Sequence, residues 1–118
     1  MKYVLMIYQG ATPALPGSDR WKALPEAEQK AIYADYAQIS KAPGVAPGPP
    51  LGLPNAARTV QVRDGKPQVK NGTYQAEGVG GYMVFEAETM EAAVALAARI
   101  PAARLGGAVE IRPAEQYW

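Results

Sequence analysis

The fold is decided by a short stretch near the N-terminus, where residues 2–8 read KYVLMIY. Large apolar and aromatic side chains occupy odd and even positions alike, which is typical of a strand covered on both faces. The apolar run is too short for the core of a signal peptide or for a membrane span. We therefore predict a strand over residues 2–8, a cytoplasmic protein and no membrane partner.

A second apolar stretch, GYMVFE, spans residues 81–86. Two further segments, TVQVR at residues 59–63 and AVEIR at residues 108–112, alternate apolar and polar side chains, as strands with one solvated face do. We therefore expect residues 2–8 and 81–86 to be the central strands of one sheet and the two alternating segments to be its outer strands.

A hairpin signal follows the alternating segment at residues 59–63. Asp64 and Gly65 favour a tight turn between two strands. Residues 67–70 are the expected return strand, and Pro67 places that strand at an edge because it lacks an N–H to donate. A second local signal, the cluster of glycines at residues 78–81, predicts a bulge or a close backbone approach before the strand at 81–86.

Two helices are predicted between the strands. Pro25 suits the first position of the earlier helix, whose apolar spacing is Ile32, Tyr36 and Ile39. Thr89 is the expected N-cap of the later helix, and Pro101 is expected to stop it.

Prolines and glycines interrupt the chain at two places between the predicted strands and helices. Residues 11–24 are predicted as a loop, and residues 43–54 as an ordered loop or an irregular edge.

This order predicts one α+β domain over residues 1–118, with the ferredoxin-like βαββαβ arrangement and an extra hairpin strand. Its antiparallel sheet would carry two helices on one face. The central strands also offer apolar side chains to the other face, and soluble monomers rarely expose such a patch. We therefore expect a homodimer formed through the open sheet face. The alternative is a monomer whose loops at 11–24 and 43–57 cross the sheet.

Composition excludes several function classes. The chain has 118 residues, of which 48% are apolar and 19% charged, and its net charge of +1 offers no basic excess for nucleic acid. Cysteine and histidine are both absent, which removes disulfides, thiolate nucleophiles and the commonest metal ligand and general base. We expect no metal site, no cofactor and no nucleic-acid partner.

Several segments together resemble the YCII-related, or DGPF-domain, family: residues 1–8, 59–66, 80–82, 98–104 and 106–113. The resemblance implies the dimeric α+β barrel, in which two ferredoxin-like sheets pack face to face with clefts between them. The same resemblance also implies an accessory or regulatory role.

The chain departs from the family pattern at its name-giving motif. The family's Asp-Gly-Pro-Phe is represented here by Asn71, Gly72, Thr73 and Tyr74. Some relatives carry a His–Asp pair suggested to be catalytic, which a chain without histidine does not inherit.

Six residues are candidates for binding a ligand: Tyr8, Arg58, Asn71, Glu77, Tyr82 and Arg112. A tyrosine hydroxyl can orient a planar or oxygenated ligand, and arginine is a two-pronged donor to carboxylate. Asn71 and Glu77 lie where the family motif sits, and Glu77 would need burial to act as an acid or base. The structural alternatives are tyrosine packing, arginine salt bridges, an exposed glutamate, and an asparagine with positive φ before Gly72.

Three functions remain open from these observations. The first is a dimer that binds a small ligand between its sheets without established catalysis. The second is a cofactor-free enzyme of the monooxygenase or isomerase type, acting on a small cyclic or aromatic substrate. The third is an accessory protein-interaction module linked to transcriptional regulation.

Overall fold

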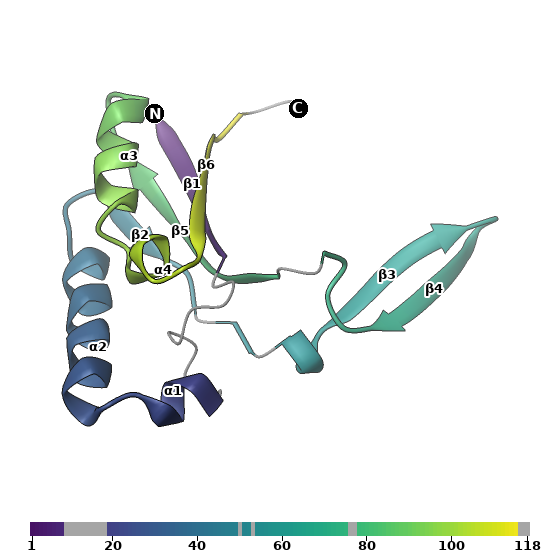
Figure 1. Ribbon diagram of the computed structural model, residues 1–118. Helices are drawn as coiled ribbons and strands as arrows, with labels where there is room; N and C mark the ends of the chain where they lie inside the picture. Colours follow the sequence, from purple (N-terminus) through teal and green to yellow (C-terminus); the bar gives the residue numbers. More distant parts are fainter. Residues whose placement is uncertain (9–18, 50, 53, 76–77, 116–118) are drawn as a thin grey trace.

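The computed structural model describes residues 1–8, 19–49, 51–52, 54–75 and 78–115. Four strands form an antiparallel sheet in the order β2–β5–β1–β6 (Figure 1): β1 (Lys2–Tyr8), β2 (Val45–Pro47), β5 (Val79–Glu86) and β6 (Ala108–Pro113). The two strands predicted to be central, β1 and β5, are central. The mixed α+β, ferredoxin-like arrangement is therefore confirmed.

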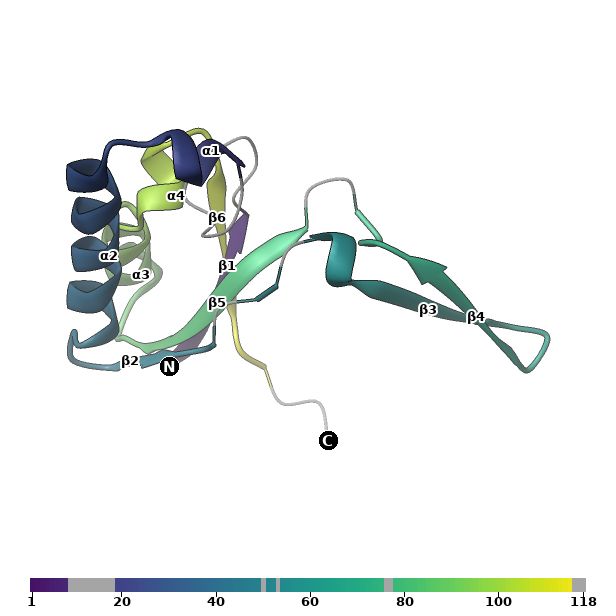
Figure 2. The same ribbon diagram turned by 90° about the horizontal axis from the view of Figure 1, so that it is seen from below.

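The helices all lie on one side of this sheet (Figures 1 and 2): α1 (Asp19–Ala23), α2 (Glu26–Ser40), α3 (Met90–Ala97) and α4 (Pro101–Arg104). Alternation along β1 follows from that arrangement, because Tyr3, Leu5 and Ile7 are buried while Val4, Met6 and Tyr8 are half-buried. The odd-numbered side chains therefore face the helices.

The core lies between the sheet and these helices. Leu5 of β1, Ile39 of α2 and Ile100 between α3 and α4 have exposed fractions of 0%, 1% and 0%. Met83 of β5 and the small side chain of Ala93 complete the contact between the layers. Burying a side chain such as leucine or isoleucine contributes roughly 1.5–3 kcal/mol to the free energy of unfolding, so these contacts hold the helices on the sheet.

The helix boundaries show where local signals succeed and fail. Thr89 caps α3 as predicted, its Oγ1 accepting from the Ala92 N–H at 3.2 Å. Pro25 occupies the N-cap of α2, one residue earlier than expected. Pro101 does more than stop a helix, because it begins the short helix α4. Part of the predicted loop at 11–24 is also helical, as α1.

The prediction that residues 59–63 form an outer strand of the main sheet is wrong. They belong to β3 (Arg58–Arg63), which pairs only with β4 (Lys66–Asn71) in a separate two-stranded sheet. The tight turn itself is confirmed: Asp64 and Gly65 have φ of 50° and 73°, as a hairpin turn with two left-handed residues requires. The hairpin extends well away from the four-stranded sheet (Figures 1 and 2).

The outer position beside β5 is taken instead by β2, which lies in the proline-rich segment that was predicted as an ordered loop or irregular edge. Pro47 is tolerated there because an edge strand has one unpaired side. The chain continues along β5, with the Gly48 N–H donating to the Tyr82 carbonyl at 3.0 Å and the Leu51 N–H to the Gly80 carbonyl at 3.2 Å. A short 3-10 helix at Pro54–Ala56 leads into β3.

Two smaller features complete the fold. The register of β1 against β5 shifts between Ile7 and Tyr8, so that Gly80 has no place in the ladder, which confirms the bulge predicted from the glycine cluster. In the part of the chain that the structure describes, no helix combines the length and the apolar character needed to cross a membrane.

Candidate functional site

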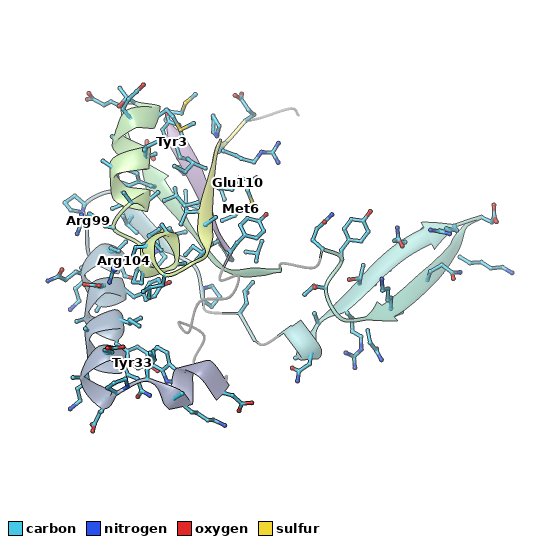
Figure 3. All side chains as sticks on the ribbon, viewed as in Figure 1. Tyr3, Met6, Tyr33, Arg99, Arg104 and Glu110 are labelled. Atoms are coloured by element: carbon cyan, nitrogen blue, oxygen red, sulfur yellow. The ribbon has the colours of Figure 1, made fainter. Side chains whose placement is uncertain are left out.

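The candidate site is the face of the four-stranded sheet turned away from the helices, here called the open face. Cross-strand partners in a sheet share a face, so the register places these residues on it: Lys2, Val4, Met6 and Tyr8 of β1; Tyr82, Val84 and Glu86 of β5; Glu110 and Arg112 of β6; and Ala46 of β2. Figure 3 shows Met6 and Glu110 on this side, away from Tyr3 and the helices.

The centre of the open face is apolar and aromatic. Met6 lies between Tyr82 on one neighbouring strand and Glu110 on the other. Val4 lies beside it in the next row, paired with Val84. Tyr82 is 41% exposed even though it sits on a central strand. A large aromatic ring is therefore offered to whatever covers the middle of the sheet.

Charged side chains surround this apolar centre with balanced signs. Lys2 and Glu86 are direct partners across the β1–β5 ladder. Glu110 and Arg112 stand two residues apart on β6, which puts both on the open face. Two basic and two acidic groups thus lie around a patch of apolar side chains, and all four residues are exposed.

The structure places three of the six predicted site residues on the open face, each in a different row of the strand register. Tyr8 is half-buried at the end of β1, Tyr82 lies on β5 and Arg112 on β6. The hydroxyl-bearing rings and the guanidinium therefore come from three adjacent strands. Such a set offers phenolic donors and a planar cationic fork on one surface.

Arg58 and Asn71 are placed elsewhere, as partners at the base of the β3–β4 hairpin. The Arg58 guanidinium donates from Nη1 to the carbonyl of Ala57 at 2.9 Å. Asn71 ends β4, and it does not have the positive φ considered for it; Gly72 has φ of 95° instead. Glu77 lies outside the described residues.

The base of the hairpin is held by hydrogen bonds that involve Gly72. Its N–H donates to the Ala57 carbonyl at 2.9 Å, and its carbonyl accepts from Thr59 Oγ1 at 2.9 Å. These bonds clamp the two ends of the hairpin together where Arg58 and Asn71 lie. The position of both residues is therefore defined by the turn at Gly72 and by strand pairing.

A hollow that the sequence did not reveal lies on the helical side of the sheet. It has a volume of about 200 Å³ and is lined by Asp35, Gln38, Ile39, Arg99 and Arg104 (Figure 3 labels both arginines). Arg104 Nη2 donates to Asp35 Oδ2 at 2.5 Å, so one guanidinium is already neutralised. The two arginines were visible in the sequence only as part of the family resemblance, since their distance from Asp35 along the chain hides the pairing.

The open face and the helical hollow are both without a candidate metal centre. Across the described ranges, no three acidic side chains come together in a group that could hold a metal ion. The open face presents tyrosine hydroxyls, charged side chains and apolar side chains.

Comparison with known proteins agrees with the architecture. A search of curated proteins found no match to the chain. The sequence model of the YCII-related domain matches residues 1–116, which span β1 through β6 and the hairpin between them. Since the match covers nearly the whole chain, the protein belongs to the YCII-related domain family.

Proposed function

We propose that this YCII-related protein acts as a homodimer that binds a small, oxygenated or carboxylate-bearing ligand between two open faces. The observation that carries the proposal is the exposure of Tyr82 at the centre of the sheet, beside half-buried Val4, Met6 and Val84. Contiguous apolar surface of this kind on a soluble chain marks an interaction site.

The balance of charge around the apolar centre supports a second copy as the cover. In a two-fold dimer the same patch meets itself, so each group must find its complement on an identical surface. Glu110 and Arg112 satisfy that condition, because Arg112 of one copy can meet Glu110 of the other. Lys2 and Glu86 repeat the pattern on the neighbouring strands.

The ligand class follows from the polar groups that reach the same face. Arg112 offers a planar fork that matches a carboxylate, whereas Tyr8 and Tyr82 offer hydroxyl groups beside apolar rings. Tyr82 and Arg112 stand in neighbouring rows of the register, so a small molecule with an apolar or aromatic body and one carboxylate fits this pair, whereas Tyr8 lies two rows from Arg112. Benzoate is the simplest probe of that chemistry.

The dimer is tested by charge reversal combined with sedimentation equilibrium. Arg112→Glu and Glu110→Arg should each raise the dimer dissociation constant, because each puts like charges opposite one another. The double variant, which restores opposite charges, should recover most of the lost affinity. Arg99→Glu, which changes the charge equally on the helical side, is the matched control. A species of 12.6 kDa at every concentration would contradict the dimer.

The ligand is tested by thermal shift with benzoate, benzyl alcohol and cyclohexanecarboxylate. Benzoate should raise the melting temperature most, since it alone of the three combines an aromatic ring with a carboxylate. Arg112→Lys keeps the positive charge but loses the fork, so it should reduce the benzoate shift, and Arg99→Lys should not. If none of the three probes shifts the melting temperature, the proposed ligand cleft is contradicted. If a probe shifts the melting temperature and is recovered unchanged after incubation with the protein, binding without catalysis is favoured.

A further inference from the structure

The β3–β4 hairpin, residues 58–71, is called the arm here, and its two faces differ sharply. Register places Val60 opposite Val69 and Val62 opposite Pro67 on one face, with the Arg58–Asn71 pair at the base of the same face. The opposite face pairs Thr59 with Lys70, Gln61 with Gln68 and Arg63 with Lys66. The arm is therefore amphipathic, like a strand pair that packs against something on one side.

Nothing within the described chain covers the apolar face of the arm. Val60, Val62 and Val69 are 60%, 67% and 65% exposed. A two-stranded hairpin without a packing partner is marginally stable in water. Apolar β-branched side chains thus form a surface that the described part of this chain leaves exposed.

The accessible surface area of the chain is larger than that of a compact monomer of the same mass. Its accessible area is 7962 Å², whereas a compact monomer of 12.6 kDa exposes about 6,200 Å². The excess of about 1,800 Å² on one chain is more than the roughly 800 Å² per partner that a standard protein–protein interface buries. The radius of gyration, 15.9 Å, is likewise above the value of about 13.5 Å for a compact chain of this length.

Charge indicates what kind of partner fits the arm. The arm carries four basic residues and one acidic residue: Arg58, Arg63, Lys66 and Lys70, with Asp64. The rest of the chain carries eight basic and ten acidic residues. The arm and the rest of the chain therefore carry opposite net charges, which attracts the arm of one copy towards the body of a second copy. Because Arg63, Lys66 and Lys70 lie on the face opposite the valines, this attraction acts at a distance and not within the apolar contact.

The direction of the arm agrees with this partner. In both views the arm extends on the side of the sheet opposite to α2 and α3 (Figures 1 and 2). A second copy packed on the open face would lie on that same side. The arm of each copy would then run along the body of the other.

We propose that the arm docks on a second copy of this chain, with the face formed by Val60, Val62, Pro67 and Val69 buried against the partner's body. This inference rests on the homodimer proposed above and adds to it a second, exchanged contact. Two-fold symmetry makes the exchange mutual, so each copy both gives and receives an arm.

Isosteric substitutions test the apolar contact. The triple variant Val60→Thr/Val62→Thr/Val69→Thr keeps side-chain shape and β-branching but places three hydroxyls on the buried face. We expect it to raise the dimer dissociation constant at least about tenfold, because each hydroxyl loses its water on docking. Gln61→Thr/Gln68→Thr changes the other face of the same strands and should alter the constant less than about threefold. Circular dichroism checks that both variants are folded.

Thiol labelling gives a second measurement that does not depend on affinity. The chain has no cysteine, so Val62→Cys and Gln61→Cys each introduce a single thiol, on opposite faces of β3. Maleimide should modify Val62→Cys at least about tenfold more slowly when the protein is concentrated enough to dimerise than when it is dilute. The rate for Gln61→Cys should change less than about threefold.

The outcomes separate the arm from the dimer itself. A chain that is monomeric at all concentrations overturns both proposals. A dimer that is unaffected by the triple substitution, and in which the two thiols react at equal rates, overturns the exchanged arm alone. Slow labelling of Val62→Cys that is independent of concentration also overturns it, because the arm would then pack on its own chain.

Discussion

Gly48 and Tyr82 are packed so closely that a β carbon on Gly48 would lie 2.7 Å from Cε2 and Cζ of the Tyr82 ring. The same β carbon would lie 2.8 Å from the Tyr82 carbonyl oxygen, which accepts the Gly48 N–H at 3.0 Å. The missing side chain of Gly48 therefore leaves the space that the most exposed aromatic ring of the open face occupies. The proline-rich segment after β2 thus takes part in shaping the candidate site.

Gly48→Ala should lower the free energy of unfolding by about 1–3 kcal/mol, because either the Tyr82 ring or the backbone of β5 must move. Urea denaturation measures the change. Gly52→Ala is the matched control, since its nearest neighbour would be Ala56 Cβ at 3.9 Å, an ordinary contact. It should change the free energy of unfolding by less than about 0.5 kcal/mol. Equal effects of the two substitutions would contradict the close packing of Gly48.

Leu5→Ala should destabilise the protein by about 2–5 kcal/mol, because Leu5 is fully buried between β1 and the helices and leaves a cavity. Val94→Ala removes methyl groups from a side chain that is 51% exposed, so it should cost less than about 1 kcal/mol. Both are measured by the shift of the urea midpoint at constant slope. A loss of less than about 1 kcal/mol in the free energy of unfolding for Leu5→Ala would contradict the position of Leu5 in the core.

Thr89→Ala should cost about 0.5–2 kcal/mol of stability, since it removes the oxygen that accepts the Ala92 N–H at the start of α3. Thr89→Ser keeps an equivalent oxygen and should retain most of that stability. Thermal unfolding followed at the helical circular-dichroism band compares the two. If serine and alanine are equally destabilising, the cap contributes less than its geometry indicates.

Asp35 and Arg104 should show a coupling energy of about 0.2–1 kcal/mol in a double-mutant cycle, because their side chains are 38% and 49% exposed and the pair is partly screened. The coupling should shrink in 1 M salt. Glu26 and Lys30, an i,i+4 pair with side chains about four-fifths exposed, provide the comparison and should couple by no more than about 0.5 kcal/mol. A coupling that does not respond to salt would contradict a mainly electrostatic origin.

Local patterns in the sequence predict several parts of the fold correctly. The stretch at 2–8, apolar at odd and even positions alike, is the central strand β1, as predicted. Asp64 and Gly65 form the tight turn, since both residues tolerate positive φ. Thr89 caps its helix for an equally local reason, the reach of its hydroxyl to the Ala92 N–H.

The candidate site could be predicted in part. Tyr8, Tyr82 and Arg112 share the open face because alternation along strands that were correctly assigned fixes their orientation. Arg58 and Asn71 could not be placed by the same reasoning, because their strands left the main sheet. The pairing of Asp35 with Arg104 joins two elements 69 residues apart, and no local pattern encodes that distance.

The sequence by itself determined the long strands, the two main helices and which side chains of each strand share a face, because these depend on periodicity and on backbone preferences within a few residues. It did not reveal the short elements α1, α4 and β2. Only the tertiary structure decided that β2 borders β5 and that β3 and β4 form a separate arm. An alternating strand pattern states that one face seeks apolar cover, but it does not state what provides that cover. Which strand borders β5 depends on which sheet edge the connecting chain can reach. It also depends on competition between segments that are distant in sequence, and this competition is decided only when the whole chain folds.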